Sequence, residues 1–494
     1  MSFSTQDLLA LAPTLTLTVG ALVLLLTEVF LRGERRGYQA MVTASTAAVA
    51  LGLYLQLGAA AADKPYALLG GFAVIDGFSC FAGATLCAGL FLTALLGTGF
   101  LEARGAERGE FYALLLLATA GMCLMVQGND LLFIFVALEM MSVATYALAT
   151  YLRADQKPTE AAFKYFLLGA VSSAFFLFGA ALCFGASGHT SLAGIAAAKA
   201  SPLLLAGLAL LLVGFAFKIA AVPFHMWAPD VYEGSPTPVT AFMAVAVKTA
   251  AFATLLRVLL TAFSGAGLAG PQAWQPVLWG LAALTMLVGN LSALSARSVK
   301  RMLAYSSIAH AGYLLMAVVA GGNAAVRDEA TSGLLFYVAS YTVTAAGAFG
   351  VVALLERLNP DDPQPWDLDR FAGLAQRRPW VAAAMTVLML SLAGIPPTAG
   401  FIGKLLIFRA AVDAGQVGLA VVGVLSSLIG LYYYLRIVVY MYFRPAAQQL
   451  AAAQPRGWPG DLALIGCAVA ALWFGILSGP LTAAAKAAGT LFAG

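Results

Sequence analysis

Long apolar stretches separated by short polar segments run through this chain from residue 9 to residue 485. A helix needs roughly 20 apolar residues to cross the hydrocarbon part of a bilayer. On that length, the sequence predicts an all-α membrane protein of about fourteen spanning helices. The predicted spans are residues 9–31, 39–60, 72–100, 111–127, 129–152, 159–186, 203–231, 237–263, 274–294, 300–320, 329–357, 380–411, 415–443 and 460–485.

The composition excludes several classes of protein. Only 10% of the 494 residues are charged and 61% are hydrophobic, whereas soluble domains carry about 25% charged residues. The net charge of +4 is too small to indicate nucleic-acid binding. The five cysteines form no CxxC pair, and no Gly-rich nucleotide fingerprint is present. We therefore expect no cofactor, no metal and no redox site in this chain.

Lysine and arginine are unevenly distributed between the predicted loops. If the N-terminus is outside, seventeen of the 27 lie on the inner side, five on the outer side and five within spans. The inner set is Arg32, Arg35, Arg36, Arg104, Arg108, Arg153, Lys157, Arg297, Lys300, Arg301, Arg357, Arg370, Arg377, Arg378, Arg436, Arg444 and Arg456, and the outer set is Lys64, Lys199, Arg327, Arg409 and Lys486. Because positive residues favour the cytoplasmic side, this bias predicts that both termini lie outside.

Five ionisable residues lie inside predicted spans, where a lone charge costs on the order of 3 kcal/mol. They are Glu139, Lys164, Lys218, Lys248 and Lys404. The simpler alternative to a function is that each reaches an interface or pairs to join helices. Glu139 and Lys218 lie too centrally for that, whereas Lys164 and Lys404 lie closer to a span end. Arg257 and Arg409, near outer helix ends, fit the simpler alternative.

Buried lysines suggest a proton path. Burial favours the neutral amine and a nearby carboxylate favours the ammonium ion, so a lysine between these influences exchanges protons readily. We predict that movement of Glu139 relative to Lys218 switches the proton affinity of this lysine. Lys248 and Lys404 would then relay protons laterally and outward.

Histidines are further candidates for such a path. His225 follows Lys218 closely, and His310 lies midway along the span at 300–320. Imidazole passes protons through its two nitrogens, so both are relay candidates, although a packing role explains either equally well. His189 lies in a polar outer loop, where the simpler alternative is preferred.

Prolines predict two broken helices. Pro223 follows Lys218, and the segment Ile395–Gly400, with two prolines, precedes Lys404. Each break would occupy the fourth helix of a five-helix unit, so the units would be inverted repeats. The predicted division is 1–110 for helices one to three, 111–263 for the first repeat, 274–443 for the second repeat and 460–494 for the last helix.

Three stretches carry a resemblance to a known family: GFAFKIAAVPFHMWAPDVYEGSPTPVTAFMAVAVKTA, SVKRMLAYSSIAHAGYLL and GIPPTAGFIGKLLIF. They resemble the antiporter-like subunits of proton-translocating NADH:quinone oxidoreductase, respiratory complex I, and the likeness covers nearly the whole chain. Within the family the chain is most similar to the N subunits. It has lysine at 404, where M subunits carry glutamate, and no long lateral helix as in L subunits.

The resemblance implies proton pumping driven by electron transfer from NADH to quinone elsewhere in a complex. It implies that Glu139 is the key carboxylate and Lys218 the key lysine, with Lys164, Lys248, Lys404 and, more loosely, His310 at further charged positions. NADH, flavin, iron–sulfur clusters and quinone are then expected in partner subunits. The neighbours would be the K and M subunits, with the lateral helix of L alongside, in a bacterial inner membrane.

Two other functions stay open on the sequence. One is a subunit of a multi-subunit sodium/proton antiporter, which shares the fold. The other is a membrane scaffold that no longer moves protons. The costly buried charges argue against a scaffold, because a scaffold has no need of them.

Overall fold

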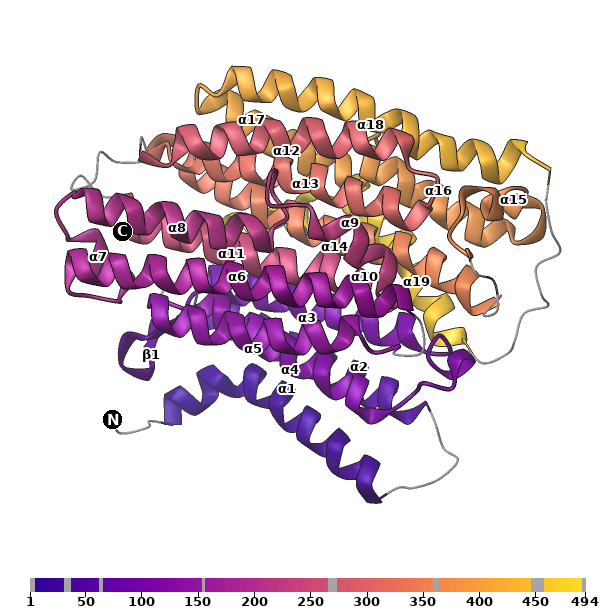
Figure 1. Ribbon diagram of the computed structural model, residues 1–494, viewed down its shortest axis with the longest axis horizontal. Coiled ribbons are helices and arrows are strands. Elements are labelled where there is room, and N and C mark those ends of the chain that lie inside the picture. Colours follow the sequence, from indigo (N-terminus) through magenta and orange to yellow (C-terminus); the bar gives the residue numbers. More distant parts are fainter. Residues whose placement is uncertain are drawn as a thin grey trace.

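The computed structural model describes residues 5–30, 37–61, 65–152, 156–264, 273–358, 362, 364–445 and 457–490. Its helices run side by side along one common direction (Figure 1). Twelve of the described helices are long and apolar enough to cross a membrane. Two shorter apolar helices, Pro202–Lys218 and Pro379–Ala393, each continue in a second helix after a break. Twelve and two make the fourteen crossings that the sequence predicts.

The first three crossings are α1 (Thr5–Phe30), α2 (Tyr38–Ala61) and α3 (Gly77–Gly97). A small antiparallel hairpin of β1 (Tyr66–Leu68) and β2 (Ala73–Ile75) precedes α3, with Tyr66 opposite Ile75. The predicted span 72–100 therefore began too early, inside the hairpin. Gly70 and Gly71 form its turn with positive φ angles, a conformation that glycine adopts without steric cost.

The next crossings contain the first predicted break. The helices of this part are α4 (Gly109–Gln127), α5 (Leu131–Ala149), α6 (Gln156–Ser187), the short connecting α7 (Leu192–Ala196), α8 (Pro202–Lys218), α9 (Trp227–Gly234), α10 (Thr237–Phe242) and α11 (Lys248–Ala262). Ala220, with φ of 56°, turns the chain out of α8. A π-helical turn at Met243–Val247 joins α10 to α11 and ends just before Lys248. The sequence pattern did not predict this turn.

The remaining crossings contain the second predicted break. The helices of this part are α12 (Gln275–Ser295), α13 (Val299–Gly321), α14 (Arg327–Leu358), the short α15 (Leu374–Arg377), α16 (Pro379–Ala393), α17 (Ala399–Asp413), α18 (Val417–Phe443), α19 (Trp458–Ile476) and α20 (Gly479–Gly489). Gly394, with φ of 81°, ends α16. The predicted last span is divided at Leu477–Ser478, because Pro480 has no N–H to donate to the carbonyl of Ile476, the last residue of α19.

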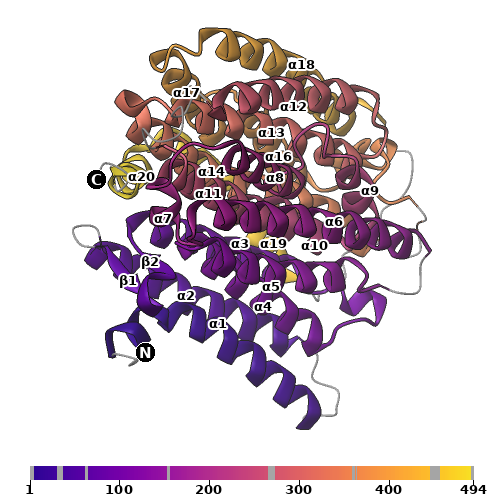
Figure 2. The ribbon, with the colours of Figure 1, turned by 60° about the vertical axis from the view of Figure 1, so that its left-hand side comes forward.

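The centre of the bundle is formed by α11, α13 and α14, which are almost wholly buried. Figures 1 and 2 show α13 and α14 inside, with α18 at the top and α1 at the bottom of the molecule. The outer helices expose large apolar side chains such as Phe178, Leu428 and Tyr432. So many exposed apolar side chains would cause aggregation in water, but they suit contact with lipid or with other membrane subunits.

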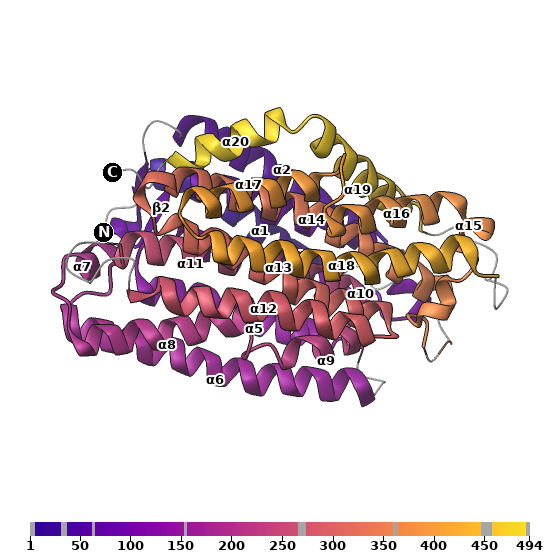
Figure 3. The same ribbon diagram turned by 90° about the horizontal axis from the view of Figure 1, so that it is seen from above.

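The loops are divided between the two ends of the bundle. The hairpin and α7 lie at one end together with the first turn of α1, and α15 lies at the other end (Figures 1 and 3). Which end faces the cytoplasm stays a prediction from the loop charges. Several of those charges lie outside the described residues: Arg32, Arg35, Arg36, Lys64, Arg153 and Arg456, together with the side chain of Lys157.

Arg257 and Asp76 form a buried ion pair near the α7 end, with Nη1 and Oδ2 2.8 Å apart. Arg257 also donates to the Val126 carbonyl, and Asp76 caps α3. The pair therefore joins α11 to α3 and α4, which is the structural role expected for Arg257. Burial favours a raised pKa for the Asp76 carboxyl, but Arg257 and Ser79 hold that pKa below its usual value.

The first prediction concerns the stability of this pair. We expect Asp76→Asn to lower the unfolding free energy by about 3–5 kcal/mol, because it leaves the Arg257 charge buried without a counter-charge. Thermal denaturation of the purified complex would measure the loss. Asp413→Asn, in an exposed pair with Arg409, is the matched control and should cost about 0–1 kcal/mol. Equal denaturation temperatures for the two variants would contradict the prediction.

The ion pair of Arg257 and Asp76 also makes the stability of the folded protein depend on pH. A carboxyl whose pKa is lowered in the folded state contributes stability above its ordinary pKa of about 4. That contribution is lost as the pH falls through the lowered pKa. Asp76→Asn should therefore remove part of the destabilisation that acid causes in the wild-type protein.

Candidate functional site

The two helix breaks bring lysines to the ends of half-helices. Lys218 lies in the last turn of α8. Lys404, on α17, donates from Nζ to the carbonyls of Leu392 and Ala393 at 3.1 and 2.9 Å, and these carbonyls end α16. The C-terminal end of a helix carries a partial negative charge, which favours a cation there. Each break thus provides a site for a buried ammonium ion.

Lys218 is 2% exposed and is held by two side chains of α5. Its Nζ donates to Ser142 Oγ at 2.8 Å and to Tyr146 Oη at 3.3 Å. Both acceptors are hydroxyl groups, which also donate hydrogen bonds. The lysine is therefore buried among groups that accommodate either the ammonium ion or the neutral amine.

Glu139 lies on the same face of α5 as Ser142 and Tyr146, since these residues are three and seven positions further along. It is half-buried, and Ser173 of α6 donates a hydrogen bond to its carboxylate. No ion pair within 4.0 Å joins Glu139 to Lys218 in the described structure. Glu139 therefore lies on the face of α5 that binds Lys218 of α8, with the two charges apart.

Lys248 and His310 lie in the buried centre of the bundle. Lys248 donates to the carbonyl of Ser307 on α13 and to its Oγ at 2.5 Å. His310, itself on α13, hydrogen-bonds through Nδ1 to Tyr337 Oη at 2.6 Å and through Nε2 to Tyr434 Oη at 3.1 Å. Both residues are 3% exposed. Each therefore has hydroxyl or carbonyl partners that can exchange or hold a proton.

Lys404 continues this line of side chains. Its Nζ donates to Ser427 Oγ at 2.8 Å and lies 4.9 Å from the ring centre of Tyr313. Ser307, His310 and Tyr313 follow one another at intervals of three on α13, so they share one helix face. A row of polar side chains therefore runs along α13 from Lys248 through His310 towards Lys404. We call Lys218, Lys248, His310 and Lys404 the central row.

Besides Glu139, two predicted site residues, Lys164 and His225, lie outside the central row. Lys164 is 45% exposed and forms ion pairs with Glu160 at 2.9 Å and Asp230 at 3.2 Å. His225 is half-buried in the segment between α8 and α9. Of the three residues for which a structural role was preferred, Arg257 pairs with Asp76 as described above, Arg409 pairs with Asp413 at the surface, and His189 lies in an exposed loop.

Several residues that complete the site were not predicted. Ser142, Tyr146 and Ser173 hold Lys218 and Glu139, and Tyr337 and Tyr434 hold His310. Ser142 and Tyr146 could have been found from the sequence, because they lie at helical intervals from Glu139. The others come from helices whose proximity only the fold defines.

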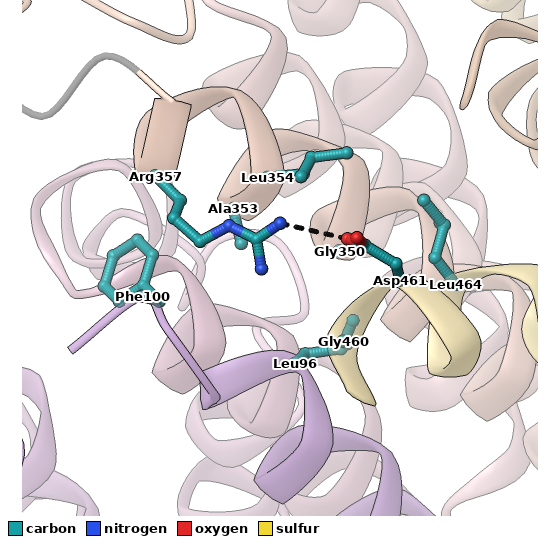
Figure 4. A pocket seen from close by; sticks show the side chains of 9 residues that line it. All are labelled: Leu96, Phe100, Gly350, Ala353, Leu354, Arg357, Gly460, Asp461 and Leu464. Atoms are coloured by element: carbon teal, nitrogen blue, oxygen red, sulfur yellow. Dashed lines mark hydrogen bonds and ion pairs between the residues drawn. The ribbon is translucent and has the colours of Figure 1, made fainter. Parts of the chain in front are cut away.

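A pocket lies between α3, α14 and α19 and is separate from the central row (Figure 4). Apolar side chains, including Leu96, Phe100 and Leu464, line it beside Arg357 and Asp461, which form an ion pair at 3.0 Å. Its lining contains no lysine, histidine or glutamate. In the part of the chain that the structure describes, no group of three or more potential metal ligands occurs either.

Comparison with known proteins agrees with this architecture. The family described as NADH:quinone oxidoreductase/Mrp antiporter matches residues 128–430. The curated NADH-quinone oxidoreductase subunit N of Myxococcus xanthus is 49% identical, with 99% of each chain covered. A chain of respiratory complex I from Thermus thermophilus superposes with a TM-score of 0.78 at 38% identity, covering 95% of this chain and 98% of that chain.

A subunit of the Mrp complex from Dietzia has the same fold, with a TM-score of 0.84 over 99% of this chain and 98% of that one, at 23% identity. At that identity the likeness concerns the fold alone. The higher identity lies with complex I and extends over nearly the full chain. The chain therefore belongs to the antiporter-like membrane subunits of NADH:quinone oxidoreductase, as a subunit N.

Proposed function

We propose that the central row is the proton path of this subunit. The observation that supports it is the burial of three lysines and one histidine, the most exposed of them 6% exposed, with hydroxyl and carbonyl partners on neighbouring helices. Lone charges at this depth are costly and usually mark ion or proton pathways. The subunit then translocates protons while electrons pass from NADH to quinone elsewhere in the complex.

The proposed switch is the pair of Glu139 and Lys218. When the carboxylate approaches, it stabilises the ammonium form of Lys218, and when it withdraws, it favours release of the proton. The structure has Glu139 bound to Ser173 and Lys218 bound to Ser142, which corresponds to the withdrawn arrangement. Lys248, His310 and Lys404 would then pass the proton across the bundle. Lys164 and His225 would act at the border of this path.

The remaining parts of the proposal concern the surroundings of the subunit. It would carry no redox group, with flavin, iron–sulfur clusters and quinone in partner subunits. Its neighbours would be the K and M subunits and the lateral helix of L. The positive-inside bias supports both termini on the outer side of a bacterial inner membrane. The two units 111–263 and 274–443 stay a predicted pair of inverted repeats, supported by one broken helix in each.

The second prediction tests this function through Lys248. Methionine has a similar length but no proton to exchange, so Lys248→Met should lower proton pumping and NADH oxidation by about tenfold or more. Both rates would be measured together in membrane vesicles that contain the assembled complex. Lys199→Met, which changes an exposed loop lysine, is the control. Normal pumping by Lys248→Met would refute the proposed path.

The same vesicles distinguish the antiporter alternative. A sodium/proton antiporter would move protons only in exchange for sodium and without NADH. The proposed function predicts pumping that requires NADH oxidation and persists in sodium-free medium. Dependence of pumping on sodium would favour the antiporter.

A further inference from the structure

A second group of buried charges lies away from the central row, at the α15 end of the bundle. Glu356 lies near the end of α14, Lys300 in the first turn of α13, and Arg104 in the loop after α3. Glu356 is 2% and Lys300 is 1% exposed. We call these three residues the Glu356 cluster.

Glu356 is held firmly on two sides. Arg104 Nη2 donates to its Oε2 at 3.2 Å, and the hydroxyl of Thr237 donates to its Oε1. Lys300 is bound differently, because its Nζ donates to the Ser235 carbonyl at 2.6 Å and lies 3.8 Å from Glu356 Oε1. That distance is longer than a hydrogen bond. Glu356 is therefore a counter-ion in a fixed position, whereas Lys300 is a cation that is only loosely paired with it.

A purely structural pair does not account for this cluster. One cation is sufficient to neutralise a buried carboxylate, and Arg104 already does so through a hydrogen bond of 3.2 Å. A second buried cation adds a desolvation cost that its long contact repays poorly. A lysine that loses its proton readily avoids that cost, whereas arginine stays charged. The arrangement thus favours Lys300 as a proton-exchanging group.

The position of Lys300 connects the cluster to the central row. Ser307, the partner of Lys248, lies seven residues further on α13, which is two turns on the same face and a rise of about 10.5 Å. On the other side, Thr237 begins α10, which continues through the π-helical turn to Lys248. Arg104 is 19% exposed, so the cluster also reaches the surface of the subunit.

We propose that Lys300 takes up protons from the aqueous phase at the α15 end and delivers them to Lys248, with Glu356 as the counter-ion. This inference rests on the proposed function. The neutral Lys300 amine takes a proton from water and becomes an ammonium ion beside Glu356. The ammonium ion then loses a proton towards Ser307 and the neutral amine of Lys248, which becomes the ammonium ion. Lys300 returns to the neutral amine, and Glu356 stays ionised throughout.

Lys300→Arg tests the proposal, because arginine keeps the positive charge and cannot release its proton. The assay uses inverted vesicles that carry the assembled complex, so that the cytoplasmic face meets the medium. We expect NADH oxidation and proton pumping to fall by about fivefold or more. Because uptake then limits turnover, the remaining rate should increase as the medium is acidified, approaching about tenfold per pH unit.

The matched control is Arg301→Lys, on the adjacent residue of α13, whose ion pairs with Asp230 and Glu233 are partly exposed, unlike the buried Lys300. It should leave the rate and the pH profile unchanged. If Lys300→Arg also keeps the wild-type rate and profile, a fixed cation is sufficient and the proposal is overturned. If Lys300→Arg does not assemble, Glu356→Gln replaces it, and a wild-type profile there overturns the proposal as well.

The result for Lys248→Met separates this inference from the proposed function. If Lys248→Met stops pumping and Lys300→Arg does not alter it, the central row stands and only the uptake role of Lys300 fails. If neither substitution alters pumping, the central row itself is not the path.

Discussion

Lys218→Ala should leave the complex assembled and reduce both proton pumping and NADH oxidation on the order of 100-fold, the range associated with loss of a positioned proton-transfer group. Lys218 is 2% exposed and binds Ser142 on α5, the helix that carries the predicted switch carboxylate, Glu139. Without the Lys218 amine, movement of Glu139 no longer causes a proton to be bound or released. Because oxidation and pumping are coupled, a blocked proton step also slows the electron transfer.

The contacts of Lys218 explain why assembly should survive. Its partner Ser142 already donates to the Leu138 carbonyl at 2.6 Å, so removal of the lysine leaves that hydroxyl with a partner. Removal of a buried charge also removes its desolvation cost. The structural cost of the substitution then comes mainly from the cavity that it leaves, and a large-to-alanine change in a core costs about 2–5 kcal/mol.

NADH oxidation and proton pumping would be followed in one vesicle sample, with the content of assembled complex as reference. Lys199→Ala, at an exposed lysine of the loop before α8, is the control and should behave as wild type. Normal pumping by Lys218→Ala would show that the path runs elsewhere or that the subunit is a scaffold. Loss of assembly would contradict the structural part of the argument.

The crossings could be predicted from the sequence because membrane-spanning helices follow directly from length and hydropathy. The two breaks were also predictable, since proline removes a backbone donor and disfavours helical geometry in the residue before it. Pro223 and Pro396 mark both, and the structure has breaks at these positions. The spans and the breaks could therefore be predicted because both depend on local properties of the chain.

Features that depend on local hydrogen bonding were missed. The π-helical turn before Lys248 contains the apolar residues Met243–Val247, whose sequence does not differ from that of an ordinary helix. The hairpin of β1 and β2 is short and apolar, so part of it was predicted to belong to a span. Hydropathy identifies such segments as apolar, and it does not separate a strand or a π turn from a helix.

The candidate site was predictable only in part. Charged residues within spans stand out because each is costly there, so the central row could be named from the sequence. The hydrogen-bond partners Ser173, Ser307 and Tyr434 could not be named, because serine and tyrosine are common in membrane helices. Lys300 was counted among the basic residues of the inner loops and Glu356 was not singled out, and only the packing of α10, α13 and α14 shows that they are buried together.

Lys404→Ala should abolish pumping for two reasons that a second substitution separates. The lysine ends the central row, so its loss removes the last proton-carrying group before the α7 end. Its Nζ also satisfies the carbonyls of Leu392 and Ala393, and an unsatisfied buried carbonyl costs about 1–3 kcal/mol. We therefore expect Lys404→Ala to lower the amount of assembled complex as well as its rate.

Lys404→Arg distinguishes the two causes. Arginine keeps a positive charge and donors near the C-terminal end of α16, so it should restore much of the assembly. It cannot release its proton, so pumping and NADH oxidation per assembled complex should stay at about a tenth of the wild-type values or lower. The control is Arg409→Ala on the same helix, where the side chain is 77% exposed.

Wild-type pumping by Lys404→Arg would assign Lys404 the role of a helix cap with a fixed charge, because a residue that never loses its proton would then be sufficient. The central row would in that case end at His310. A low rate with restored assembly would show that the second broken helix holds a lysine that must change its protonation state. That requirement would explain why a buried amine, and not an arginine, lies against the end of α16.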